Sequence, residues 1–500
     1  MNDPEAERAC TGIPGLDDIL NGGLIEHRLY LVDGNPGSGK TTLALQYLLQ
    51  GVKEGQKCLY ITLSETREEL IASARSHGWD LDGIEIVELV ANEAELDGSR
   101  ELTMLHPSDV ELTDTLRKVL GAIERVNPGR MVFDSLSELR LLAQSSLRYR
   151  RQLLALKQFF VGRRCTILML DDRTAEGPDL QLHSIAHGVV SLDSNTLPYG
   201  PLRRELRVTK LRESDFASGF HDFEIVRGGL VVFPRLMAPD HATEYARASL
   251  PSGITALDSL LGGGVDRGTT TLLIGPPGSG KSTVALQYAA AAAQRGDHAA
   301  VFMFDETRAA LLTRAAGIGQ HIREGAGPGE IALRKINPVE ISPGEFTQAV
   351  REAVERHSAR IVVIDSLNGY LNSMPHEDFL AAQLHELLSY LNNQGIVTLL
   401  VLAQSGMFGS MASPVDASYL ADSVVLFRFF EHRGNVKKAI SALKKRTGAH
   451  EESIRELWFD GEGIHVGEPL LRFRGILTGM PVEVTSPGPG GPGRAFGDAT

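Results

Sequence analysis

Two stretches of the sequence have the residue types and spacing that bind the phosphates of a nucleotide. Both read Gly, four residues, Gly-Lys and a hydroxyl residue. In this pattern backbone N–H groups wrap a phosphate, the lysine reaches the β- and γ-phosphates, and the hydroxyl ligates Mg²⁺. A chance Gly-rich turn is the alternative, but each stretch follows an apolar run and opens a helical pattern. The sequence predicts two sites for ATP, formed by Gly34, Asn35, Pro36, Gly37, Ser38, Gly39, Lys40, Thr41 and Thr42, and by Gly275, Pro276, Pro277, Gly278, Ser279, Gly280, Lys281, Ser282 and Thr283.

An aspartate ends an apolar strand pattern downstream of each phosphate loop. Asp134 follows Met-Val-Phe, and Asp365 follows Ile-Val-Val-Ile. An acid at this place holds Mg²⁺ together with the loop hydroxyl. The alternative is an aspartate that only caps a turn. We predict metal sites formed by Thr41 with Asp134 and by Ser282 with Asp365.

Hydrolysis also needs a carboxylate that orients or deprotonates water. Glu65 and Glu306 follow the second apolar strand of their copies, and the carboxyl ends of parallel strands are where such sheets bind ligands. We predict that they act as general bases, with Lys40 and Lys281 as catalytic partners. Asp305 supplies a second acid in the later copy only. Solvated loop charges are the alternative.

Two basic pairs occupy matching places late in the chain, Lys210 with Arg212 and Lys444 with Arg446. Alternate residues of a strand point to one face, so each pair could contact a γ-phosphate, in the same chain or from a neighbouring subunit. A solvated edge strand is the other interpretation. His450, close to the second pair, is a further candidate for the phosphates.

The chain consists of one domain written twice. Three matched pairs share an offset of 241 positions: Gly12 and Gly253, Lys40 and Lys281, and Glu65 and Glu306. Asp134 and Asp365 differ by 231 positions, so the first copy holds about ten additional residues, expected between 91 and 109. We expect a first domain at 1–238, a second at 239–482 and a disordered Gly/Pro-rich tail at 483–500.

Apolar strands that alternate with amphipathic helices indicate an α/β fold in which helices flank a mostly parallel sheet in each copy. The predicted strands are 28–33, 58–63, 130–134 and 166–170 in the first copy, and 270–274, 299–304, 360–365 and 396–401 in the second. The predicted helices are 41–54, 116–126, 147–163, 282–295, 346–357 and 378–393. Further strands are expected near 206–211 and 439–443.

Bulk composition is that of a soluble globular protein, with 42% hydrophobic and 23% charged residues. The net charge of −13 argues against nucleic acid or an anionic membrane as a partner. The three cysteines match no zinc or redox spacing. No secretory signal and no run of 18 apolar residues is visible. We expect a cytoplasmic protein.

With these residues in view, the chain resembles the double-domain KaiC family of RecA-like ATPases. The resemblance rests on the opening Ser/Thr-Gly-Ile with Leu-Asp, the two phosphate loops, the Glu-Thr pairs, the Asp-Ser pairs and the late Lys-x-Arg. It implies two tandem RecA-like domains, a homo-hexamer of two stacked rings, and ATP between neighbouring subunits. The Lys-x-Arg pairs would then act on the neighbour's nucleotide.

In this family the first ring is mainly an ATPase, and the second adds autokinase and autophosphatase activity. Ser418 matches the first phospho-acceptor, and Ser413 matches an auxiliary hydroxyl position. Tyr419 replaces the usual threonine acceptor, so the two-step phosphorylation cycle of the family is not carried over; Tyr419 and Ser413 remain alternative acceptors. Ser64 replaces an acid that the family often has in the first copy, and the Gly/Pro-rich tail differs from the family's.

The sequence thus favours an ATP-hydrolysing serine autokinase in signalling or clock-type regulation, with signalling or clock proteins as partners. Two alternatives stay open. One is a nucleotide-gated hexameric scaffold without kinase activity. The other is a DNA-dependent RecA-like motor, disfavoured because no basic, aromatic-rich loop for single strands is recognisable.

Overall fold

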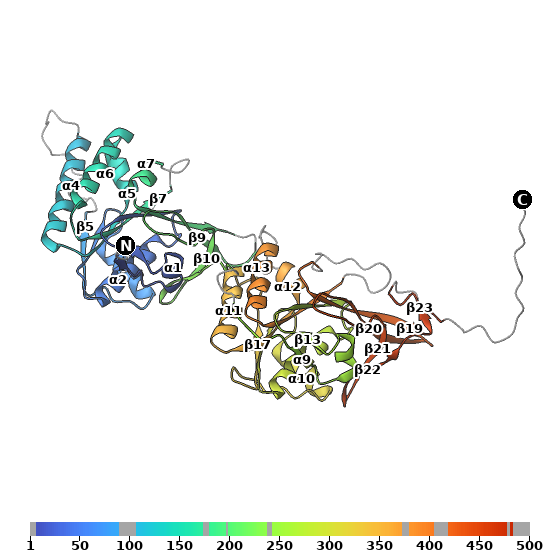
Figure 1. The fold of residues 1–500 in the computed structure, drawn as a ribbon. Helices are drawn as coiled ribbons and strands as arrows, with labels where there is room; N and C mark the ends of the chain where they lie inside the picture. The colour runs from blue at the N-terminus through green and yellow to red at the C-terminus, as the bar shows by residue number, and fades with distance from the viewer. Residues whose placement is uncertain are drawn as a thin grey trace, which may run out of the picture. The chain divides into compact units, whose positions relative to one another are not determined.

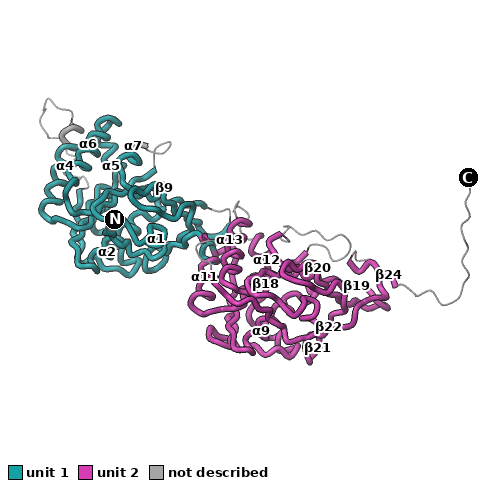
Figure 2. The backbone as a smooth tube through the Cα atoms, viewed as in Figure 1, with its two compact units in different colours: residues 1–235, 342–346 teal, residues 236–341, 347–500 magenta. Residues whose placement is uncertain are grey.

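A computed structural model gives the fold of the chain. It describes residues 7–89, 107–173, 180–196, 199–237, 243–372, 380–404, 419–477 and 481–483. The predicted acceptors Ser413 and Ser418, most of the segment expected to hold the additional residues, and the tail beyond Glu483 lie outside the described residues. The chain divides into two compact units, residues 1–235 with 342–346 and residues 236–341 with 347–500 (Figure 2).

The first unit, which holds the N-terminus in Figure 1, is organised around a nine-stranded sheet with the order β11-β10-β9-β8-β3-β7-β6-β4-β5. Strands β8, β3, β7, β6, β4 and β5 are parallel, and β9, β10 and β11 add antiparallel hairpins. The strands are β3 Leu29–Gly34, β4 Cys58–Thr62, β5 Ile84–Glu88, β6 Arg130–Asp134, β7 Thr166–Asp172, β8 Gly188–Asn195, β9 Arg203–Leu211, β10 His221–Val226 and β11 Gly229–Phe233, and a separate pair is β1 Arg8–Ala9 with β2 Leu24–Ile25.

Helices cover both faces of this sheet because its central strands are buried on both sides, as in β4, where every residue is buried. One hydrophobic cluster joins the sheet to α1, α2 and α3, and another joins it to α4, α5 and α6. The helices are α1 Pro14–Ile19, α2 Lys40–Lys53, α3 Arg67–Ser76, α4 Pro107–Val126, α5 Leu136–Ala143, α6 Ser146–Phe160 and α7 Leu180–Ile185.

The second unit repeats the arrangement with the order β16-β15-β17-β18-β14-β19-β20-β21-β22. Its strands are β14 Thr270–Gly275, β15 His298–Met303, β16 Ile331–Lys335, β17 Ala359–Asp365, β18 Val397–Ala403, β19 Ser423–His432, β20 Asn435–Lys445, β21 Arg455–Asp460 and β22 Gly463–Pro469. Two short pairs are β12 Ser249–Leu250 with β13 Val265–Asp266, and β23 Phe473–Arg474 with β24 Val482–Glu483.

Helices α9 and α10 share a hydrophobic cluster with this second sheet, while α12 and α13 contact β18. The helices are α8 Thr255–Leu260, α9 Lys281–Gln294, α10 Arg308–Gly317, α11 Pro343–Glu355, α12 Leu367–Asn372 and α13 Leu380–Asn393. Two mostly parallel sheets with flanking helices confirm the predicted tandem α/β fold. In the described part of the chain, no helix has the length and apolar character needed to cross a membrane.

The opening Ser/Thr-Gly-Ile motif has a structural role that is the same in both units. The Asp17 carboxylate accepts a hydrogen bond of 2.8 Å from the backbone N–H of Thr11, and Asp258 accepts one of 2.7 Å from that of Ser252. The glycine between these residues adopts a positive φ, 76° at Gly12 and 82° in the second unit, which a side chain would disfavour. The motif's aspartate therefore closes the loop that precedes the first helix.

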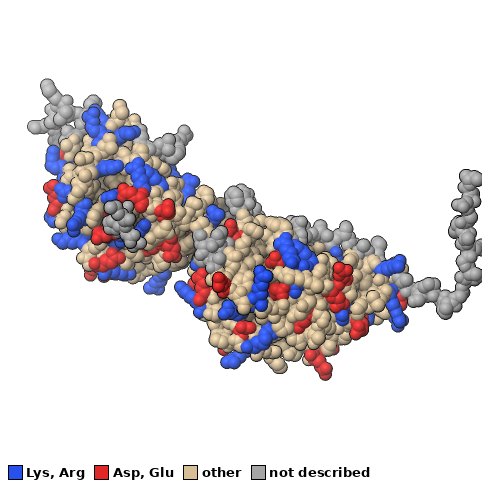
Figure 3. All heavy atoms as spheres, viewed as in Figure 1, with Lys and Arg blue, Asp and Glu red and all other residues tan. Residues whose placement is uncertain are grey.

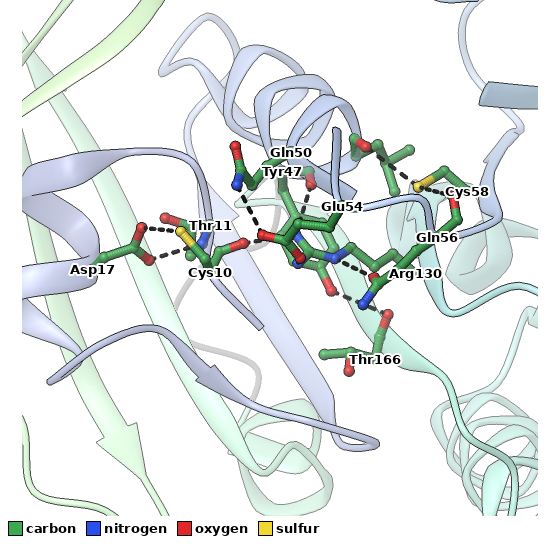
Figure 4. Close-up of polar contacts among 11 residues, drawn as sticks. Cys10, Thr11, Asp17, Tyr47, Gln50, Glu54, Gln56, Cys58, Arg130 and Thr166 are labelled. Carbon is green, nitrogen blue, oxygen red and sulfur yellow. Dashed lines mark hydrogen bonds and ion pairs between the residues drawn. The ribbon is translucent and has the colours of Figure 1, made fainter. Parts of the chain in front are cut away.

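A buried arginine anchors the same loop in the first unit (Figure 4). Arg130, at the start of β6, has no exposed surface and donates 2.6 Å to the Cys10 carbonyl and 2.7 Å to the Gln56 side chain. It also pairs with Glu54. In the second unit, Arg295 instead donates to the carbonyl of Pro251, the counterpart of Cys10. The two copies hold one loop carbonyl with arginines from different places.

Candidate functional site

The first phosphate loop connects the central strand β3 to helix α2 at the carboxyl edge of the sheet. Gly37 and Gly39 have φ values of 77° and 104°, conformations that favour glycine. A Cβ on Gly34 would lie 2.4 Å from the Leu192 carbonyl oxygen, so the strand end also requires glycine. The three glycines of the sequence pattern therefore lie at positions where the backbone conformation or the close packing favours glycine.

The second loop, between β14 and α9, has the same backbone. Gly278 and Gly280 have φ values of 76° and 103°. A Cβ on Gly280 would lie 2.3 Å from the ring of Phe459, and one on Gly275 would lie 2.4 Å from the Phe427 carbonyl oxygen. Each loop opens a 14-residue helix whose first N–H groups and positive dipole end face the loop.

Both loops hold polar groups that suit a phosphate. The hydroxyls of Ser38 and Ser279 are fully buried and have no hydrogen-bond partner among the described residues. Lys40 Nζ donates to the carbonyls of Gly34 and Asn35 at 3.0 and 2.9 Å, and Lys281 Nζ donates to that of Pro276 at 2.7 Å. Buried donors that lack a partner or bend back onto their own loop fit a site whose natural acceptor is a phosphate.

The two loop lysines differ in their acidic neighbours. Lys40 forms an ion pair of 2.7 Å with Asp172, which lies beside Gly34 at the end of β7. The equivalent position in the second unit, beside Gly275, is Ala403. There, burial lowers the pKa of Lys281 to about 8, opposed by the Asp365 carboxylate. An anionic ligand bound next to Lys281 would favour the protonated, positively charged form of this lysine.

The predicted metal-binding aspartates lie beside their loop hydroxyls. Asp134 is buried and accepts a hydrogen bond of 2.5 Å from the Tyr60 hydroxyl. Burial raises the pKa of Asp134, while its contacts with Tyr60, Lys40 and Thr41 act in the opposite direction. Carboxylate and hydroxyl oxygens together form the kind of hard-oxygen donor set that Mg²⁺ prefers.

The second unit repeats this pairing. Burial raises the pKa of Asp365, and its hydrogen bond with Ser282 lowers it. The neighbouring acid Asp305 accepts a hydrogen bond from the Ser366 hydroxyl. The structure thus brings Ser282, Asp365 and Asp305, which come from separate stretches of the sequence, to one sheet edge.

The two candidate bases lie at matching strand ends but in different electrostatic surroundings. Burial raises the pKa of Glu65, and the nearby carboxylates of Asp134, Glu69 and Asp172 raise it further. In contrast, Glu306 forms an ion pair of 2.7 Å with Arg314. The carboxylate in the first unit is therefore surrounded by acidic side chains, whereas the one in the second unit is held by a guanidinium.

The Lys-x-Arg residues of the first unit lie away from their own phosphate loop. Lys210 is registered with Val189 on β8, and the neighbouring Gly188 is registered with Tyr30 near the start of β3. Strand β3 then runs four more residues, on the order of 13 Å, before the loop begins. Lys210 Nζ donates 2.6 Å to the carbonyls of His183 and Ala186, and burial lowers its pKa.

Arg212 is exposed and lines a pocket of about 390 Å³ at this amino-terminal edge of the first sheet. The pocket is strongly basic, with Arg28, Lys157, Arg163, Arg164, Arg212, His27 and His187 in its wall. Arg28 pairs with Glu213, and Lys157 donates to the Ile185 carbonyl. Arg212 thus belongs to a cationic pocket at the sheet edge opposite the nucleotide loop of its own unit.

The second basic pair lies beside the described end of the predicted acceptor segment. Lys444 Nζ donates 2.7 Å to the Ala421 carbonyl, and Arg446 donates 3.5 Å to the Tyr419 carbonyl and pairs with Asp422 at 3.5 Å. Strand β20 places Lys444 opposite Val424, again at the amino-terminal edge. Tyr419 is 56% exposed, and His450 follows the same strand in a half-buried position.

Three residues near the sites were missed by sequence reasoning: Tyr60, Asp172 and Arg314. Tyr60 lies inside an apolar strand, where nothing in the sequence distinguishes it from a packing residue. Asp172 reaches Lys40 because β7 lies beside β3, an order that a local pattern does not reveal. Arg314 had a usable signal, because the offset of 241 pairs it with Ser73 rather than with another arginine.

Fold and site together define a tandem RecA-like ATPase with a phosphate loop in each copy. The profile of the family "ATPase: KaiC" matches residues 9–237 and again residues 250–470. The chain belongs to the KaiC ATPase family, which implies that it binds ATP.

Three curated relatives are similar along nearly the whole chain. The circadian clock protein KaiC3 of Synechocystis sp. is 26% identical over 484 residues, covering 95% of both chains. The circadian clock oscillator protein KaiC of Synechococcus elongatus is 26% identical over 482 residues, covering 95% of this chain and 92% of the relative. That of Picosynechococcus sp. is 25% identical over 485 residues, covering 96% and 93%.

Proposed function

We propose that this chain is an Mg²⁺-dependent ATPase that works as a cytoplasmic homo-hexamer, with a serine autokinase and autophosphatase in its second copy. The observation that carries this proposal is the position of the basic pairs. Lys210, Arg212, Lys444 and Arg446 lie at the edge of each sheet that is opposite its own phosphate loop. Such residues complete a nucleotide site only when a neighbouring subunit supplies the loop, which is why a ring is the natural assembly.

Within one site, the residues divide the work of phosphoryl transfer. The loop glycines and Lys40 or Lys281 hold the phosphates, while Thr41 with Asp134, or Ser282 with Asp365, hold Mg²⁺. Magnesium neutralises charge on the β- and γ-phosphates when it is bound. Glu65 and Glu306 receive the proton of the attacking group, with Asp305 as an additional acid beside Asp365. His450, which follows the second basic pair, approaches the phosphates bound by the neighbouring subunit's second copy.

The autokinase reaction is supported by the contact between Arg446 and Tyr419, the residue that follows the predicted acceptor Ser418. Ser418 precedes Tyr419, whose carbonyl lies against Arg446. If Arg446 contacts the neighbour's γ-phosphate, the adjacent hydroxyl is delivered to the same place. Ser418 Oγ then attacks the γ-phosphorus, the bond to the β–γ bridging oxygen breaks, Glu306 takes the hydroxyl proton, and ADP leaves. Tyr419 and Ser413 are the alternative acceptors.

Signalling or clock proteins are the partners we propose, since the similar relatives carry circadian clock names. The scaffold alternative keeps the same assembly and the ATPase, without phosphoryl transfer to protein. The DNA-dependent motor is less well supported, because lysine and arginine are interspersed with acidic side chains over the face of the molecule shown in Figure 3. A continuous basic track is what single-stranded nucleic acid requires.

The test is the intact mass of the purified chain after incubation with Mg²⁺-ATP, with Ser418→Ala and Lys281→Ala in parallel. We expect the mass of one phosphate to be gained by the unmodified chain and by neither variant. A gain that persists in Ser418→Ala would move the acceptor to Tyr419 or Ser413. An unchanged mass with continuing ATP hydrolysis would refute the autokinase and favour the scaffold.

A further inference from the structure

A single arginine clamps the candidate base of the second site. Arg314, on α10, donates through Nη2 to one Glu306 carboxylate oxygen at 2.7 Å and through Nε to the other at 3.2 Å. Its third contact is a hydrogen bond of 3.0 Å from Nη1 to the Thr283 hydroxyl, in the first turn of α9. The guanidinium thus ties the glutamate to the helix that opens the phosphate loop.

The first site lacks this clamp. The offset of 241 pairs Glu306 with Glu65 and Thr283 with Thr42, but it pairs Arg314 with Ser73. Ser73 lies on α3, the counterpart of α10, and its short side chain carries no charge. The arginine that holds Glu306 therefore has no counterpart at the matching position of the first unit.

The clamp changes what the carboxylate can do. A carboxylate in a two-point contact with a guanidinium has both oxygens engaged in hydrogen bonds. To orient water or accept a proton, Glu306 has to release at least one of these contacts. Among the residues that the structure describes, Glu65 makes no such contact, and its neighbours are acidic.

We propose that Arg314 is a positioning residue that restrains Glu306 and makes hydrolysis at the second site slower than at the first. This inference rests on the base roles proposed above for Glu65 and Glu306.

The test is a reciprocal exchange in the full chain. Glu65→Gln silences the first site, and Arg314→Ser in that background gives the second site the residue of the first. We expect kcat for hydrolysis to rise about tenfold, because Glu306 no longer has to release roughly one charge-assisted hydrogen bond before it acts. KM should change little. Arg314→Lys, which keeps the charge without the two-point geometry, is expected to give an intermediate rate.

The matched experiment introduces the clamp into the first site. Ser73→Arg in a Glu306→Gln background is expected to lower the first-site kcat. A second-site kcat that is unchanged or lower in both Arg314 variants, with an unchanged thermal unfolding transition, would overturn the inference. Failure of the underlying function has a different signature, because the Glu65→Gln, Glu306→Gln double variant would then hydrolyse ATP at the rate of the unmodified chain.

Discussion

Replacing Arg130 by methionine is expected to destabilise the first unit strongly. The guanidinium is fully buried and donates to two backbone carbonyls, those of Cys10 and Tyr47, and to the Gln56 side chain. It also pairs with Glu54, whose side chain is 34% exposed. Methionine fills a similar length with apolar atoms but donates no hydrogen bond.

The expected loss of unfolding free energy depends on which groups lose their hydrogen-bond partner when Arg130 is replaced. The Glu54 carboxylate can return to water, whereas the Tyr47 carbonyl is buried and the Cys10 carbonyl is only partly exposed. A buried polar group left without a partner costs about 1–3 kcal/mol, and removing one member of a buried ion pair costs about 3–5 kcal/mol. Because Glu54 is partly exposed, we expect Arg130→Met to lower the free energy of unfolding by about 4 kcal/mol, within the range for the two carbonyls together.

Urea unfolding followed by fluorescence isolates this effect. The chain has two tryptophans, Trp79 packed against the core of the first unit and Trp458 in the second. In a Trp458→Phe background the signal reports the first unit alone. Ile361→Val, at the position equivalent to Arg130, is the control and should leave this transition unchanged. A loss below about 1 kcal/mol in Arg130→Met, the net worth of one ordinary hydrogen bond, would refute the reasoning.

Two further predictions concern the first site and are measured in a Lys281→Ala background. First-site hydrolysis is expected to fall as the pH drops through the raised pKa of Glu65. Glu69→Gln removes one negative neighbour and lowers that pKa, so the acid limb of the pH–rate profile should move to lower pH; an unmoved limb would contradict the assignment of Glu65 as the base. Asp172→Ala removes the carboxylate that holds Lys40 and should tighten nucleotide binding about twofold to fivefold, the worth of a partly exposed ion pair. Weaker binding would instead show that Asp172 supports the bound nucleotide or its metal.

Much of the fold was accessible from the sequence because its signals are local. Strand β6 occupies exactly the predicted residues 130–134, and the core strands β3, β4 and β7 were found within two residues of their ends. Each is an apolar run, buried on both faces, that ends beside a polar residue. The strands β5 and β16 were not predicted, because their exposed faces interrupt the apolar pattern.

The site was predictable only in part, for a topological reason. The loops, Asp134 and Asp365 are each recognisable from a single stretch of chain. In contrast, the pairing of Lys40 with Asp172 depends on β7 lying between β3 and β6, which only the assembled sheet shows. The contact between Arg314 and Glu306 depends on α10 lying close to the first turn of α9, which the sequence does not show. The mismatch of Arg314 with Ser73 was visible in the repeat.

The most direct test of the central claim is to count the nucleotide retained per chain in Mg²⁺-ATP, for the unmodified protein and for Lys40→Ala, Lys281→Ala and the double variant. Two working phosphate loops predict that the unmodified chain retains two nucleotides, each single variant one, and the double variant none. An unmodified chain that retains a single nucleotide, or a double variant that still retains two, would contradict the account.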